Sequence, residues 1–153
     1  MSPANSFRFF RVLGALLLSQ AVAAQQNLIH EPDYSRPAGL SDLPDSFNCK
    51  LQDISILQNS GRGDNIVLKL ADDFQLKGIV TSLQLFSSRN TIVVRSTNFP
   101  TYTLSLIWWK NADNQTIVIG RLISFTRKDA LVLQNREGNY VWVKKDYYEL
   151  VNE

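Results

Sequence analysis

The residues that could carry out chemistry are few and scattered along the chain. The one histidine, His30, lies in a segment that contains several prolines. A serine or cysteine nucleophile needs a positioned base, and a zinc site needs several His or Cys ligands. The single cysteine, Cys49, cannot form an internal disulfide; it is a free thiol, a small buried side chain or a link to another chain. We therefore expect no catalytic residue, no metal site and no cofactor.

Carboxylates are the remaining candidates for catalysis, because the paired acids of glycosidases have no fixed spacing in sequence. Most of them follow or precede predicted strands, namely Asp72, Asp73, Asp113, Asp129, Glu137 and Asp146. Such positions are typical of solvated turn residues. The alternating oxygen-bearing side chains around Asp113 lack the bidentate glutamate that completes a calcium loop. We predict that the protein is not an enzyme and keep a carboxylate hydrolase as the third hypothesis.

A short motif, Arg62-Gly63-Asp64, resembles the adhesion motif that integrins recognise. It falls between two predicted strands, where an exposed loop would present the guanidinium and the carboxylate. A glycine and an aspartate are also ordinary residues of a tight turn. The motif thus predicts either an adhesive loop or a simple turn.

Aromatic side chains give the better indication of a binding surface. Trp109 follows another tryptophan on one predicted strand, so the two side chains point to opposite faces. On the last strand, Tyr140 and Trp142 share one face, and Val141 and Val143 share the other. If the valines face the core, Trp109, Tyr140 and Trp142 form an exposed binding face. If the aromatics fill the core, the valines cover the outer face.

The elements that would position these residues begin after a predicted leader. Arg8 and Arg11 precede an apolar run at 12–18, and small residues follow at 21–24. This order is typical of a secretory signal peptide, cleaved after Ala23 or Ala24. Ser19 interrupts the run before it reaches the length of a spanning helix. We expect residues 1–24 to be removed and the protein to be secreted or periplasmic, without a stable membrane anchor.

The leader also changes the charge balance. The chain has 16 basic and 14 acidic residues. Loss of Arg8 and Arg11 leaves 14 basic residues against the same 14 acidic ones. A neutral mature protein has no electrostatic reason to bind nucleic acid or an anionic membrane. The expected partners are therefore proteins, glycans or small molecules.

Composition divides the mature chain into two parts. Residues 25–50 hold three of the five prolines and no apolar period, which predicts an extended or disordered tether. Residues 51–153 alternate apolar and polar side chains between short turns, which predicts one β domain built from antiparallel hairpins. The predicted strands are 65–70, 74–86, 91–96, 102–109, 116–126, 130–133 and 140–144, and 51–57 as a further candidate.

Two glycines within strands predict a curved sheet. The apolar positions change from even to odd after Gly78, which indicates a β-bulge there, and Gly120 interrupts a second long strand. Asp146 and Glu149 have the spacing of a capping box. We predict an all-β fold, an antiparallel meander of six to eight strands forming a small barrel or strongly curled sheet, with a short C-terminal helix and an N-terminal extended tail.

Two functional hypotheses follow from this fold. The first is a secreted, non-catalytic binding module that holds a glycan, a peptide or a small apolar ligand on its aromatic face or in the barrel mouth. The second is an extracellular interaction or structural protein, which pairs a strand edge with a partner chain or adheres through Arg62-Gly63-Asp64. The sequence leaves open the ligand, the oligomeric state and a bacterial or eukaryotic origin.

Overall fold

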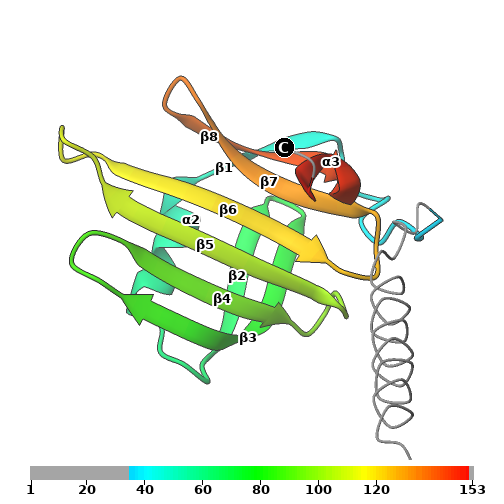
Figure 1. Cartoon of the computed structure of the whole chain (residues 1–153), viewed down its shortest axis with the longest axis horizontal. Coiled ribbons are helices and arrows are strands. Elements are labelled where there is room, and N and C mark those ends of the chain that lie inside the picture. The colour runs from blue at the N-terminus through cyan, green and yellow to red at the C-terminus, as the bar shows by residue number, and fades with distance from the viewer. Residues whose placement is uncertain (1–34, 152–153) are drawn as a thin grey trace, which may run out of the picture. The chain divides into compact units, whose positions relative to one another are not determined.

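Within residues 35–151, which the computed structural model describes, eight strands form one antiparallel sheet (Figure 1). Their order in the sheet is β1-β8-β7-β6-β5-β4-β3-β2, so β2 to β8 form a meander and β1 pairs with the last strand. The strands are β1 (Ser46–Cys49), β2 (Asn65–Ala71), β3 (Phe74–Leu85), β4 (Asn90–Ser96), β5 (Tyr102–Lys110), β6 (Thr116–Ser124), β7 (Asp129–Arg136) and β8 (Asn139–Asp146). The predicted all-β meander is confirmed.

The sheet curls strongly, so that β2 lies behind β5 in Figure 1. The curl brings the two edge strands, β1 and β2, near each other without pairing them. Phe47 on β1 and Phe74 on β3 have ring centroids 6.2 Å apart across this region. We call the space between β1 and β2 the seam.

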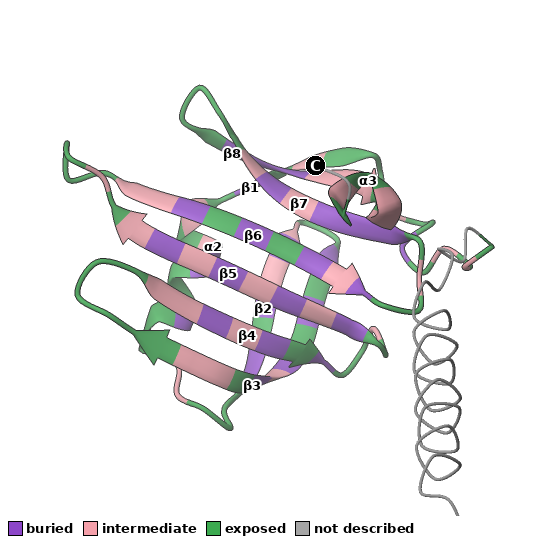
Figure 2. Ribbon diagram, viewed as in Figure 1, coloured by how far each residue is buried: buried purple, intermediate pink, exposed green. Residues whose placement is uncertain are grey.

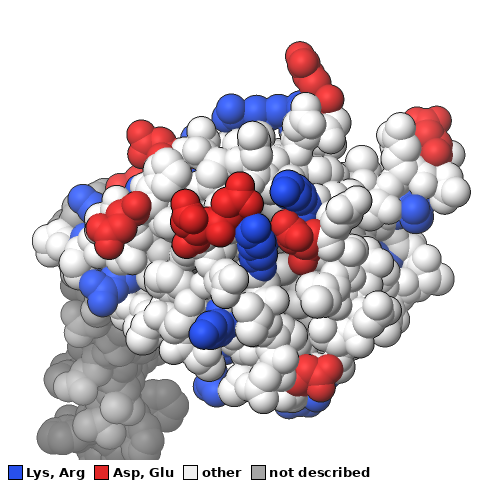
Figure 3. All heavy atoms as spheres, turned by 180° about the vertical axis from the view of Figure 1, so that it is seen from behind, with Lys and Arg blue, Asp and Glu red and all other residues white. Residues whose placement is uncertain are grey.

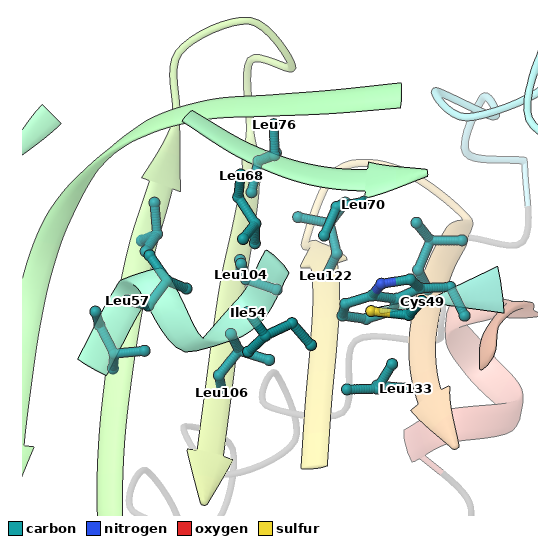
Figure 4. Close-up of a cluster of buried hydrophobic side chains, with 14 of the residues drawn as sticks. Cys49, Ile54, Leu57, Leu68, Leu70, Leu76, Leu104, Leu106, Leu122 and Leu133 are labelled. Atoms are coloured by element: carbon teal, nitrogen blue, oxygen red, sulfur yellow. The ribbon is translucent and has the colours of Figure 1, made fainter. Parts of the chain in front are cut away.

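Buried and exposed side chains alternate along the strands, and this alternation explains how the core forms. In β2 the side chains of Ile66, Leu68 and Leu70 are buried, and the residues between them are more exposed. Figure 2 shows the same alternating bands along the central strands. The buried apolar side chains of the strands meet on the concave side of the sheet, where they form a packed core that Figure 4 shows in part.

The predicted strand at 51–57 is wrong, because this segment is helical. It forms α2 (Leu51–Ser55) and the 3₁₀ turn η2 (Ile56–Asn59). Ile54 and Leu57 are buried against the concave face (Figure 4). Leu51, Ile54 and Leu57 are spaced by three residues, a helical period. The segment connects the two edge strands, and its apolar side covers the core between them.

The β domain begins earlier than residue 51. Ser46–Cys49 form β1, with Phe47 opposite Trp142 and Cys49 opposite Tyr140. Before β1, residues 36–45, which we call the strap, lie against the sheet, and Leu40 is buried. The C-terminal part of the predicted tether is therefore part of the domain. The predicted leader and His30 lie outside the described residues.

The bulge occurs three residues later than Gly78. Pairing of β3 with β4 stays regular from Gly78 to Val80 and shifts between Val80 and Ser82. Gly78 instead allows the backbones of β3 and β4 to approach closely, because a Cβ atom there would lie 2.6 Å from the carbonyl oxygen of Arg95. The change from even to odd apolar positions along β3 correctly predicts that a bulge is present, but it does not predict where the bulge lies.

The predicted C-terminal helix is confirmed as α3 (Tyr147–Val151). The Asp146 carboxylate accepts a hydrogen bond of 2.9 Å from the Tyr148 N–H and so caps its first turn. No residue of α3 is buried. Among the described helices, none has the length and apolar character needed to cross a membrane.

Candidate functional site

The predicted aromatic face is not a single surface. Trp142 is completely buried and Tyr140 is 6% exposed, both on the concave side of β8. The Tyr140 hydroxyl accepts from Val118 N–H at 3.1 Å and donates to the Thr116 carbonyl at 3.3 Å, so its polar end is used within the fold. The prediction that Tyr140 and Trp142 point outward is wrong, because the curled sheet turns this face of β8 into the core.

Trp109 lies elsewhere, on the opposite face of the sheet. It is partly exposed on β5, and the Arg89 guanidinium stacks 5.8 Å from its ring centroid. Trp108, its neighbour, points into the core. The structure therefore does not bring Trp109 together with Tyr140 and Trp142.

The Arg62-Gly63-Asp64 motif forms a tight turn just before β2. The Asp64 carboxylate accepts from Gly61 N–H at 2.6 Å, and Gly63 has a φ of +95°. The Asp64 carbonyl also accepts from Val80 N–H at 2.9 Å. All three residues of the motif are exposed, but the carboxylate is held by its own turn. The adhesive role stays a prediction.

A cavity of about 670 Å³ opens at the seam, at the end where β1 begins and β2 ends. Phe47 on β1, Phe74 on β3 and Phe99 in the loop before β5 form its aromatic wall. The ring centroids of Phe74 and Phe99 are 4.9 Å apart, in an edge-on arrangement. Leu40 and Leu43 of the strap form the facing wall. We call this space the seam cavity.

Sequence reasoning missed this cavity because its residues come from three separate segments. Phe47 stood in the predicted tether, Phe99 in a predicted turn and Phe74 at a strand end. Each apolar side chain borders a turn or chain segment that ordinarily faces solvent. Aromatic residues placed beside turns were the available signal, but only the curl of the sheet brings them together.

Carboxylates border the seam cavity. Its lining includes Asp42 of the strap and Asp72 and Asp73 of the β2–β3 turn, and it includes no Lys, Arg or His. Lys69 forms an ion pair of 2.9 Å with Asp72. The hydrogen bond and the charge of Lys69 hold the pKa of Asp72 below its ordinary value. The cavity thus combines an apolar interior with a negatively charged border.

The strap that forms one wall is anchored by Asp129. This carboxylate accepts from Gly39 N–H at 2.9 Å, from Leu40 N–H at 2.5 Å and from the Tyr102 hydroxyl. Burial alone would raise the pKa of Asp129, but the hydrogen bonds from Tyr102, Gly39 and Leu40 together lower it. The expectation that Asp129 is a solvated turn residue is wrong, because the strap covers it.

Close packing restricts the strap further. A Cβ atom at Gly39 would lie 2.6 Å from the Tyr102 hydroxyl oxygen, so only glycine fits without a shift. The Lys144 ammonium donates to the Leu43 carbonyl, and the Lys144 N–H donates to the Asp45 carbonyl at 2.8 Å. The strap wall of the seam cavity is therefore held at several points.

Cys49 is a buried free thiol (Figure 4), and the Trp142 indole lies close enough to affect its pKa. Burial raises the pKa of the thiol to about 11, and the nearby Trp142 indole opposes this only in part. A thiol with so high a pKa is a poor nucleophile at neutral pH. Within residues 35–151, no three His, Cys, Asp or Glu side chains are placed to hold a metal ion.

Comparison with known proteins identifies no relative. No protein-family model, no curated protein and no solved structure matches the chain. Arguments about function therefore rest on the seam cavity and the sheet edges themselves.

Proposed function

We propose that the protein is a non-catalytic binding module that holds a small, largely apolar molecule in the seam cavity. The observation that carries this proposal is the cavity of about 670 Å³ with three phenylalanines and two leucines in its lining. This volume lies within the roughly 300–1,000 Å³ typical of small-molecule sites. Apolar area removed from water on both ligand and protein would drive binding.

The test is titration of the protein with a neutral fluorescent probe, N-phenyl-1-naphthylamine, whose emission rises in apolar surroundings. We expect saturable binding of one probe per chain. Ala71→Trp places an indole in the cavity and should abolish the binding. Phe86→Ala, in the β3–β4 turn and outside the lining, is the control and should bind normally. Binding that survives Ala71→Trp in a folded variant would refute the assignment.

The exported location belongs to the same proposal. It rests on the order of charged, apolar and small residues at 8–24. In an exporting host the full chain should yield a cleaved product whose first residue, determined by mass spectrometry, is Ala24 or Gln25. Leu16→Arg, which places a charge in the apolar run, should leave the precursor uncleaved. An uncleaved product from the unaltered chain would contradict the proposal.

A second candidate function, pairing with a partner chain, is favoured by the free edge of β2. Val80 N–H donates to the Asp64 carbonyl, so alternate residues of β2 bond to β3. The others, including Val67, direct their backbone groups away from β3. The Val67 side chain is 54% exposed. A free strand edge is a template for pairing with another chain.

Sedimentation velocity tests this candidate in its simplest form, self-association. Edge pairing predicts a concentration-dependent dimer that Val67→Pro abolishes, because proline removes the outward N–H. The variant should bind the naphthylamine probe as the unaltered protein does. A chain that stays monomeric at every concentration would exclude self-pairing through β2.

A further inference from the structure

The charged side chains that line the seam cavity are all negative, although the mature chain is close to neutral. The cavity lining contributes three carboxylates and no cationic side chain. Lys69 compensates Asp72. Asp42 and Asp73 form no ion pair with any described residue; Asp42 accepts only a hydrogen bond of 3.3 Å from the Ser41 hydroxyl. Two carboxylates of the lining, Asp42 and Asp73, are therefore in no ion pair within the described residues, although Lys69 lies near Asp73.

The same side of the molecule carries further acidic groups. In the view from behind Figure 1, several carboxylates lie near one another, with basic side chains between and beside them (Figure 3). The hydrogen bond and charge of Asp72, with smaller contributions from Asp53 and Asp73, raise the pKa of the Lys69 ammonium. The lining itself holds three carboxylates and no basic side chain, which favours a positively charged ligand and disfavours an anion.

The interior of the cavity favours an apolar body on that cation. Leu40 and Phe74 are almost fully buried, and Phe47 and Phe99 cover the core beside them. Faces of aromatic rings also attract cations. A bare metal ion would not fit this lining, because hard cations require about six oxygen ligands.

From this charge complementarity we propose that the seam cavity recognises amphiphilic cations, small molecules in which a protonated amine is joined to an apolar chain. The inference rests on the proposed function and specifies its ligand class. The apolar chain occupies the space between the strap and the phenylalanines. The ammonium group lies at the border, near Asp42 and Asp73. A neutral analogue binds through the chain alone, and an anionic analogue is repelled.

Three ligands with one eight-carbon chain test the inference: octylammonium, octanol and octanoate, each titrated calorimetrically below its aggregation concentration. At low ionic strength we expect octylammonium to bind about three- to tenfold more tightly than octanol, as two exposed ion pairs would provide. Octanoate should bind more weakly than octanol. Raising the salt concentration should reduce both differences, since salt screens charges at the border.

Variants identify the groups responsible. The double variant Asp42→Asn with Asp73→Asn should lose the preference for octylammonium over octanol. Asp113→Asn, in the exposed β5–β6 turn, removes the same kind of charge outside the cavity and should keep the preference. Thermal unfolding of each variant checks that it is folded.

The outcomes separate the two proposals. If octanol binds and octylammonium binds no more tightly, the cation inference is overturned and the binding function stands. A preference that persists in the double variant overturns the assignment to Asp42 and Asp73. If none of the three ligands binds the folded protein, and the naphthylamine probe does not bind either, the proposed function fails as well.

Discussion

The Asp129 carboxylate joins distant parts of the chain. Its three donors come from the strap and from the first residue of β5. A buried carboxylate without partners would be costly, but here each hydrogen bond is charge-assisted. Asp129 thus fastens the strap to the sheet and keeps one wall of the seam cavity in position.

Replacing Asp129 by asparagine should lower the free energy of unfolding by about 2–3 kcal/mol. The amide keeps the volume of the carboxyl group but turns an NH₂ donor toward donors from Gly39 and Tyr102. Urea unfolding measures the change. Asp113→Asn is the control and should change the free energy little. A loss below about 0.5 kcal/mol would show that the strap does not depend on this charge.

The dependence on pH has a definite sign. The pKa of Asp129 is lower in the folded protein than its ordinary value of 3.8. The ionised carboxylate therefore adds stability that is present above about pH 4 and is lost as the pH falls through the lowered pKa. Between pH 5 and pH 2 the unaltered protein should lose more stability than Asp129→Asn. Equal slopes of the two proteins would contradict this.

At the scale of elements, the connection between the edge strands closes part of the seam. α2 and η2 run from the end of β1 to β2 and bury Ile54 and Leu57 against the concave core. At the other end of the seam, no helix of residues 35–151 fills the space, and the seam cavity lies there. The helical connection and the strap thus determine where the core is closed and where the seam cavity opens.

Adjacent residues in η2 allow a matched test of this role. Leu57 is 1% exposed and Ile56 is 59% exposed. Leu57→Ala should lower the free energy of unfolding by about 2–5 kcal/mol, through lost burial and the cavity left behind. Ile56→Ala should change it by less than about 0.5 kcal/mol. Chemical unfolding measures both, and similar losses in the two variants would show that η2 does not pack as described.

For the whole molecule, the strand order separates local from distant pairing. Each hairpin from β2 to β8 joins strands that follow one another in sequence. The pairing of β1 with β8 instead joins Cys49 to Tyr140. Closing so long a loop costs more entropy than forming a hairpin. We therefore expect β1 to dock after the meander has formed.

Folding kinetics test this order. Phe47→Ala on β1 should speed unfolding and leave the folding rate nearly unchanged, because its contacts form after the transition state. Leu104→Ala, in the buried centre of β5, should slow folding. Stopped-flow measurements in urea give both rates. A folding rate that falls as much for Phe47→Ala as for Leu104→Ala would place β1 in the nucleus.

The local sequence was sufficient for the strands and for the short C-terminal helix. Period-two alternation and turn residues act over a few positions, so they identify β2 to β8 without knowledge of the partner strands. The capping aspartate, Asp146, likewise acts within one helical turn. Where local signals compete, the prediction failed. Residues 51–57 were predicted as a possible strand, although Leu51, Ile54 and Leu57 have the three-residue spacing of a helix.

The sequence alone therefore determined the fold class, the turns and the curvature, because these depend on neighbouring residues. Only the tertiary structure decided which sheet face is inward, since a strand's two faces are distinguished by what covers them. For that reason it buried Tyr140 and Trp142 instead of exposing them. It also assembled the seam cavity from Leu40, Phe47 and Phe99, because residues far apart in sequence meet only when the sheet curls and brings its edges together.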